Sequence, residues 1–256
     1  MLVDEPAPSV ARLTISNPGK RGALDHAILD AFATTLPGLD ARSVNVTGEG
    51  SIFSAGYDIG DLPTDLLAAE AERLVAHPFA AALDALEAYP YPTLAALNGH
   101  AIGGGLELAL ACDLRIAASI ATFSMPPARL GLVYSHTGLR KFIEIVGAAR
   151  TRELFLLGRR VDAPVAREWG LVNAVTDRVD LAEGALVLAT ELAARAPLAQ
   201  RGNKRVIRAV LESQGRLQSD VERELIELRR ACFASEDFRE GVRAFAEKRE
   251  PKWQGR

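Results

Sequence analysis

The sequence predicts an α/β protein built from strand–strand–helix units and followed by a helical C-terminal region. Strand and helix candidates alternate up to about residue 136, and helices dominate after it. No low-complexity linker separates the two parts. With 256 residues, of which 48% are hydrophobic and 25% charged, the chain can bury a full core.

The first elements follow from periodicity and from turn residues. Ser9–Ser16 alternates between apolar and polar residues as a half-buried strand does, and Asn17-Pro18-Gly19 ends it. Asp25 can cap a helix that runs to about Leu36. Ser43–Thr47 is expected to form a second short strand, and a loop of small residues is expected over 53–61.

The middle of the chain repeats this rhythm. Thr64–Tyr89 is rich in Ala and Leu and is expected to be largely helical until Pro90 stops it. Thr93–Leu97 is a buried strand candidate, Leu106–Ala111 a helix and Asp113–Ala118 another strand. Further helices are expected at about 138–147, 150–157, 180–195, 197–212, 217–234 and 237–249.

Bulk properties disfavour several classes of function. A net charge of −3 and a pI of about 5.9 argue against a dedicated nucleic-acid binder, which needs a basic face. Cys112 and Cys232 lie far apart and the four histidines form no close pair, so no metal site is expected. The N-terminus does not resemble a signal peptide, and no apolar run could span a bilayer. We therefore expect a cytoplasmic protein without a membrane partner.

Two glycine-containing loops are the candidates for chemistry. The first covers 53–58, and the second covers 98–107, with Gly103–Gly105 at the start of a helix. Glycines let a ligand approach the backbone, and the first N–H groups of a helix lack internal partners. These features predict an oxyanion site for a carbonyl oxygen. Close packing of helix on strand is the alternative explanation, and the spacing fits a dinucleotide-binding fingerprint poorly.

Four stretches together resemble the crotonase (enoyl-CoA hydratase/isomerase) superfamily over nearly the whole chain. They are Asn17–Leu24, Ala55–Asp58, Gly103–Glu107 and Ala244–Trp253. The resemblance implies a crotonase spiral with a core at 1–190 that binds acyl-CoA and a trimerisation region at 191–256. It also implies homotrimers, often paired as hexamers, and no cofactor beyond the coenzyme A moiety of the substrate.

The same resemblance assigns roles to individual residues. The backbone N–H groups of Tyr57 and Gly104 would form the oxyanion hole for the thioester oxygen. Residues implied to contact coenzyme A are Lys20, Arg21, Ala23, Ala55, Asp58, Ile59 and Lys248. From the sequence alone, Lys20 and Arg21 could equally be charges in a turn, and Asp58 could simply fix the geometry of its loop.

The reaction depends on two glutamate positions. Glu107 matches the first catalytic glutamate of hydratases in this family, whereas Pro127 occupies the place of the second and offers no carboxylate. The remaining pattern is similar to bacterial methylmalonyl-CoA decarboxylases over 53–59, 121–127, 130–134 and 229–241. In that branch Tyr134 falls at an active-site tyrosine, whereas Tyr57 stands where we expect histidine.

These features favour decarboxylation of a short 2-carboxyacyl-CoA, with Pro127 and Leu132 as walls of the substrate pocket. A hydratase or other lyase that acts with Glu107 alone remains an alternative, as does a non-catalytic protein that binds acyl-CoA. A serine hydrolase lacks support, because no serine lies in a G-x-S-x-G elbow. Tyr134 could be a hydrogen-bonded core tyrosine, and Glu107 could lie on a helix surface.

Overall fold

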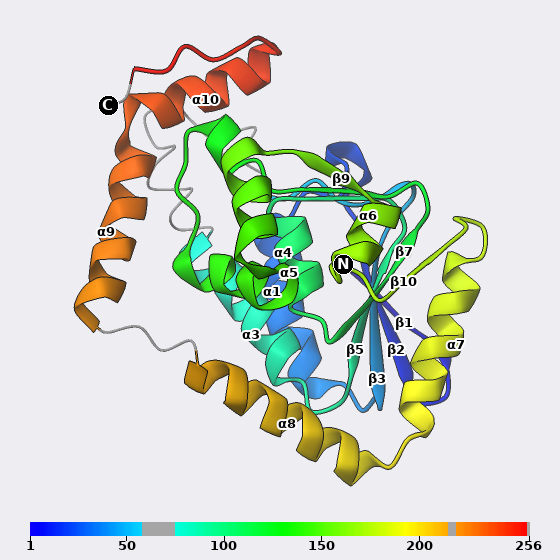
Figure 1. The fold of residues 1–256 in the computed structure, drawn as a ribbon. Helices are drawn as coiled ribbons and strands as arrows, with labels where there is room; N and C mark the ends of the chain where they lie inside the picture. Colours follow the sequence, from blue (N-terminus) through cyan, green and yellow to red (C-terminus); the bar gives the residue numbers. More distant parts are fainter. Residues whose placement is uncertain (58–74, 215–218, 255–256) are drawn as a thin grey trace.

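The computed structural model describes residues 1–57, 75–214 and 219–254, and its strands form two sheets (Figure 1). Only β1 and β2 run antiparallel in the large sheet, and only β8 and β9 in the small one. The large sheet has the order β1 (Leu2–Ala7), β2 (Val10–Ile15), β3 (Ser43–Gly48), β5 (Thr93–Leu97), β7 (Leu114–Ala118), β10 (Ala174–Thr176). The small sheet has the order β4 (Ile52–Ser54), β6 (His100–Ile102), β8 (Thr122–Ser124), β9 (Arg160–Asp162).

From β3 to β8, consecutive strands alternate between the two sheets. The pairs β3–β4, β5–β6 and β7–β8 each give their first strand to the large sheet and their second to the small sheet. This confirms the predicted strand–strand–helix rhythm. The second strands are only three residues long, so alternation could not reveal them, and the expected loop from Phe53 onwards in fact begins inside β4.

The described helices follow the strands and then continue to the C-terminus. They are α1 (His26–Thr35), α3 (Ala80–Ala88), α4 (Gly104–Leu110), α5 (His136–Leu157), α6 (Ala163–Glu168), α7 (Leu181–Ala194), α8 (Pro197–Gln214), α9 (Ser219–Ala234) and α10 (Glu236–Glu247). Asp25 caps α1 as predicted, since its carboxylate accepts a hydrogen bond of 2.8 Å from Ile28 N–H. None of the helices in the described ranges is long and apolar enough to cross a membrane.

The large sheet is buried on both faces, as parallel sheets usually are. β5 alternates accordingly: Ala95 and Leu97 join the core shared with α1, α3 and α4, whereas Leu94 and Ala96 pack beneath α7. The inner face of α7 carries small residues such as Ala185 and Ala189, which let the helix lie close to the sheet. In Figure 1 α7 covers one face of the sheet, and α1, α3 and α4 lie on the other side.

In two helical regions, the observed helix boundaries differ from the predicted ones. The part of the helix expected at Thr64–Tyr89 that precedes residue 75 lies outside the described residues. A π-helical turn, Val75–Phe79, contains Pro78 and leads into α3. The helices expected at 138–147 and 150–157 form the single element α5, which is interrupted at Gly147, where φ is +77°.

The C-terminal helices extend round the core rather than into it (Figure 1). The described side chains of α8 include none that is buried, and the helix is tied to the core by Lys204, whose ammonium donates to the Asp113 carboxylate at 2.7 Å. α9 and α10 meet through the rings of Phe233 and Phe238, whose centroids are 5.1 Å apart. Both helices also contribute residues to the candidate active site.

Candidate active site

The loop after β4 is held by the segment that precedes α1. Leu24 N–H donates to Gly56 O at 2.8 Å, and Ala55 N–H donates to Arg21 O at 3.2 Å. Ser54 strengthens this arrangement, because its hydroxyl oxygen accepts from Gly56 N–H at 3.1 Å. Two segments predicted to bind the same ligand are therefore hydrogen-bonded to each other.

The three consecutive glycines at the start of α4 have different structural reasons. Gly103 has φ +54° and ψ −125°, a conformation that favours glycine. A Cβ on Gly104 would lie 2.7 Å from Cε1 of the Tyr57 ring, and one on Gly105 would lie 2.6 Å from the Cβ of Ser54. Helix–strand packing thus explains Gly105, whereas Gly104 is required by close approach to the first loop.

The two loops bring the predicted oxyanion donors to one corner. Gly56 has φ +93°, and a Cβ there would lie 2.8 Å from Ile102 O and 3.4 Å from Gly104 N. Among the described residues, neither Tyr57 N–H nor Gly104 N–H has a hydrogen-bond acceptor. Two such backbone donors can hold negative charge on a thioester oxygen. We refer to this pair of N–H groups as the oxyanion corner.

The oxyanion corner opens into a cavity of about 720 Å³. Nine of the predicted site residues line it: Lys20, Arg21, Ala23, Ala55, Tyr57, Gly104, Pro127, Leu132 and Tyr134. Glu107 and Lys248 are not among the described residues that line it, and Lys248 instead caps the end of α10 in a left-handed conformation. Asp58 and Ile59 lie outside the described residues, so their coenzyme A contacts stay a prediction.

Glu107 is buried directly behind the cavity wall. It is 2% exposed, and one carboxylate oxygen accepts a hydrogen bond from the Tyr134 hydroxyl. The other oxygen lies over Gly138 in the first turn of α5, where a Cβ would come within 2.6 Å of it. The alternative of a glutamate on a helix surface is therefore wrong.

Burial governs the protonation of this pair. Loss of solvent raises the pKa of Glu107, although the hydrogen bond from Tyr134 and the nearby charge of Lys141 lower it in part. Burial also raises the pKa of Tyr134 well above its ordinary value, and the carboxylate of Glu107 adds to this. Tyr134 therefore keeps its proton at neutral pH and separates Glu107 from the cavity.

Another part of the cavity lining is apolar. Pro127 is buried at the start of the 3-10 helix η4 (Pro127–Leu130), and Leu132 packs against Phe233 and Phe238. Neither side chain can accept or donate a proton. The wall therefore has no ionisable group at the position where the resemblance places a second glutamate in hydratases.

The C-terminal helices also line the cavity, whereas the sequence predicted a site residue in this region only at Lys248. α9 contributes Arg229 and Phe233, and α10 with the segment after it contributes Phe245, Arg249 and Trp253. A signal was present in Gly241, since a Cβ there would lie 2.4 Å from Leu130 O. The division between a core at 1–190 and a trimerisation region at 191–256 stays a prediction.

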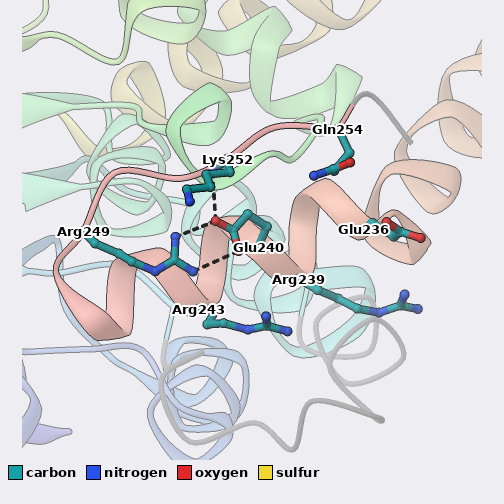
Figure 2. Close-up of a pocket in the computed structure, with 7 residues that line it drawn as sticks. All are labelled: Glu236, Arg239, Glu240, Arg243, Arg249, Lys252 and Gln254. Carbon is teal, nitrogen blue, oxygen red and sulfur yellow. Dashed lines mark hydrogen bonds and ion pairs between the residues drawn. The ribbon is translucent and has the colours of Figure 1, made fainter.

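A second hollow, of about 580 Å³, lies beside α10 and is lined by charged residues (Figure 2). In Figure 2 Arg249 and Lys252 lie toward Glu240, whose carboxylate accepts from the Arg249 guanidinium at 2.6 and 2.9 Å and from Lys252 N–H at 2.8 Å. The ion pair with Arg249 lowers the pKa of Glu240 to about 2. Within the chain, Arg249 is therefore already neutralised, while Arg239 and Arg243 line the same hollow.

Comparison with known proteins agrees with this architecture. The sequence model of the enoyl-CoA hydratase/isomerase family matches residues 5–256. The chain is 35% identical to a probable enoyl-CoA hydratase of Bacillus subtilis over 253 residues, which cover 96% of this chain and 95% of that protein. It is also 35% identical to a carnitinyl-CoA dehydratase of Salmonella typhimurium over 261 residues, with the same two coverages.

Among solved structures, the fold is similar to methylmalonyl-CoA decarboxylase in complex with 2-nitronate-propionyl-CoA. The TM-score is 0.89 and the identity 29%, with 100% of this chain and 99% of that one covered. The chain therefore belongs to the enoyl-CoA hydratase/isomerase family, and the predicted crotonase fold is confirmed.

Proposed function

We propose that this family member decarboxylates a short 2-carboxyacyl-CoA such as methylmalonyl-CoA. The observation that carries the proposal is the composition of the cavity lining. A protonated phenol, Tyr134, and apolar Pro127 and Leu132 line the same cavity as the oxyanion corner. Structural similarity to a methylmalonyl-CoA decarboxylase supports the same choice.

The reaction needs no base. The bond between the carboxylate carbon and Cα of the acyl group breaks, carbon dioxide leaves, and its bonding electron pair moves onto the thioester oxygen. The N–H groups of Tyr57 and Gly104 hold the resulting enolate oxygen. A proton then returns to Cα, from the Tyr134 hydroxyl directly or through water, which yields the shorter acyl-CoA, and Tyr134 regains a proton from solvent.

The apolar wall contributes through desolvation. A carboxylate beside Pro127 and Leu132 would lose part of its hydration, whereas neutral carbon dioxide loses little in the same place. The Tyr134 hydroxyl, which donates its single proton to Glu107 in the free chain, would turn to that carboxylate and orient it out of the thioester plane, as loss of carbon dioxide requires. The proposed roles of Tyr134 are thus orientation before bond cleavage and protonation after it.

Hydration or dehydration is the second candidate. It is favoured by the similarity to a probable enoyl-CoA hydratase and to a carnitinyl-CoA dehydratase, and by Glu107, which is hydrogen-bonded to Tyr134. The missing carboxylate at Pro127 argues against it, because general acid–base catalysis commonly contributes about 10²–10⁴ in rate. We expect crotonyl-CoA hydration to be slower by on the order of 10²-fold or more than in an enzyme with two glutamates.

The deciding experiment supplies methylmalonyl-CoA and crotonyl-CoA to the same preparation. Carbon dioxide release from the first and slow loss of the enoyl absorbance of the second would support decarboxylation. Rapid hydration would replace it with the second candidate. Neither reaction, with thioester binding retained, would support a non-catalytic acyl-CoA-binding protein.

Coenzyme A recognition and assembly are also proposals, supported by family membership and by the cationic mouth of the cavity at Lys20 and Arg21. Acyl-CoA thioesters should raise the melting temperature, because a ligand that binds only the native state stabilises it. Exposed apolar residues on α8, such as Leu198 and Ile207, support homotrimers or hexamers. Light scattering after gel filtration would test this, and a monomeric mass at micromolar concentration would contradict it.

A further inference from the structure

Aromatic rings form a partition behind the oxyanion corner. Tyr57 meets Phe79 edge to face, with centroids 4.8 Å apart and planes at 84°. Tyr134 meets Phe155 in the same way at 5.4 Å and 68°, and Phe155 in turn packs on Phe142 at 4.9 Å. The outer rings are nearly inaccessible, since Phe79 is 3%, Phe155 6% and Phe142 0% exposed. We call these five residues the aromatic partition.

Tyr57 and Tyr134 bring the two halves of the partition to the cavity, since both residues line it. Tyr134 is fixed by its hydrogen bond to buried Glu107. The Tyr134 ring therefore has a ring neighbour and a polar anchor, whereas the Tyr57 ring is held between Phe79 and Gly104. A ligand could displace a side chain held in this way only by breaking several of its contacts.

The Tyr57 ring stands beside the place of the acyl group. The same residue supplies one N–H of the oxyanion corner, and its ring lies so close to Gly104, which supplies the other, that a Cβ there would meet ring atoms at 2.7–3.1 Å. A thioester oxygen held between the two N–H groups leaves its acyl carbons next to this ring. The carbons further along the acyl chain would have to pass the partition.

We infer that Tyr57 determines acyl-chain length, because its ring closes the acyl end of the cavity and admits only short acyl groups. This inference rests on the proposed binding of acyl-CoA, but it does not depend on which reaction follows. It assigns the Tyr57 side chain a role separate from that of its backbone N–H. A small side chain at this position would leave room for additional methylenes.

The test measures the affinity of propionyl-, butyryl-, hexanoyl- and octanoyl-CoA by calorimetry. These thioesters lack a 2-carboxylate, so decarboxylation cannot complicate the readout. In the parent, affinity should fall beyond butyryl-CoA. In Tyr57→Ala, it should instead rise with chain length, by up to roughly fourfold for each methylene newly buried. Tyr57→Phe keeps the ring and should retain the limit of the parent.

Tyr91→Ala is the matched control, because it removes a partly buried tyrosine that does not line the cavity. If Tyr57→Ala does not fold, Tyr57→Leu replaces it, because leucine loses less packing. Tyr57→Leu should relax the limit on acyl-chain length in part. Octanoyl-CoA binding the parent as tightly as propionyl-CoA would overturn the inference. A folded Tyr57→Ala or Tyr57→Leu whose affinity depends on acyl-chain length as in the parent would also overturn the inference. Failure of every thioester to bind the parent would instead reject the proposed function.

Discussion

The oxyanion corner is formed by backbone groups, whereas the wall of the cavity that carries Tyr134 and Pro127 is formed by side chains. The corner uses backbone N–H groups, and its geometry depends on Gly56 and Gly104 approaching another chain segment at distances that a Cβ would prevent. The side-chain wall contains Pro127 and Tyr134, and Glu107 lies behind Tyr134. The backbone corner can serve any reaction that places charge on a thioester oxygen, whereas the side chains decide which reaction occurs.

The largest effect should come from Tyr134→Phe, which alters the side-chain wall and leaves the corner intact. If Tyr134 protonates the enolate, carbon dioxide release should fall by roughly 10²–10⁴-fold, the usual contribution of a general acid. Thioester affinity should change little because the ring is retained. Turnover and affinity of the two proteins are measured on methylmalonyl-CoA after activity of the parent has been established.

Tyr91→Phe provides the control, since it removes a tyrosine hydroxyl that is not in the cavity wall. Unchanged release in Tyr134→Phe would remove the hydroxyl from the mechanism and leave Tyr134 as a core tyrosine. Weaker binding with unchanged turnover at saturation would make it a binding group only. Either result would place the chemistry in the corner alone.

Gly104→Pro tests the corner itself. It deletes one of the two N–H donors and adds atoms where the Tyr57 ring lies 2.7 Å from a Cβ. Turnover should drop by about 10²–10³-fold, as when one donor is removed from other oxyanion holes. Gly202→Ala in α8 is the control, because a Cβ there meets nothing within 4 Å and should leave turnover unaltered. Full activity in a folded Gly104→Pro would show that the corner does not hold the thioester oxygen.

Glu107→Gln should change how stability depends on pH, because it replaces the carboxyl group that is buried behind the cavity wall. Burial raises the pKa of Glu107 above its ordinary value of 4.5, so the native state holds the proton more tightly than the unfolded chain. The parent therefore loses stability as pH rises from 4.5 through the raised native pKa, whereas glutamine does not titrate. Over this pH range, the melting temperature of Glu107→Gln should rise relative to that of the parent, by about 2–4 °C for each unit that the pKa is raised.

The difference in melting temperature is measured by thermal unfolding at a series of pH values. Glu153→Gln serves as the control, because Glu153 is partly exposed and pairs with Arg159 on the surface. A melting-temperature difference that is constant between pH 4.5 and 8 would mean that Glu107 stays as ionisable in the native state as in the unfolded chain. Tyr134 would then contact an ordinary carboxylate.

The same contrast explains what the sequence could predict. Glycine loops have a local signature, so the sequence marks Gly103–Gly105 and the loop before Tyr57 as candidates for chemistry, and the structure brings the two loops together. Asp25 likewise acts within one turn of the chain, which made the start of α1 predictable. The signature of each feature can be recognised from neighbouring residues alone.

Contacts between distant segments were harder to predict. The hydrogen bond between Tyr134 and Glu107 joins residues 27 positions apart, and nothing local shows that Glu107 lies behind the wall rather than in the cavity. The strands β4, β6 and β8 are too short for periodicity, and the return of α9 and α10 to the cavity depends on packing at Gly241. Family resemblance supplied the roles of Pro127 and Tyr134, which no pattern within the chain indicates.

The smallest effect concerns the mouth of the cavity, where neither backbone donors nor buried groups act. Arg21 is exposed, lines the cavity and has φ +57°; its backbone N–H donates to Pro18 O, and its carbonyl group accepts from Ala55 N–H. Arg21→Ala should weaken binding of coenzyme A by up to about fivefold, because a solvent-exposed ion pair contributes little. The loss should shrink as salt is raised from about 0.05 to 0.5 M, since exposed charges are screened. Arg201→Ala, on the ring of Tyr91, is the matched control. A phosphate-free acyl-pantetheine should bind Arg21→Ala and the parent equally, and an equal loss with this ligand would show that Arg21 acts on the loop rather than on phosphate.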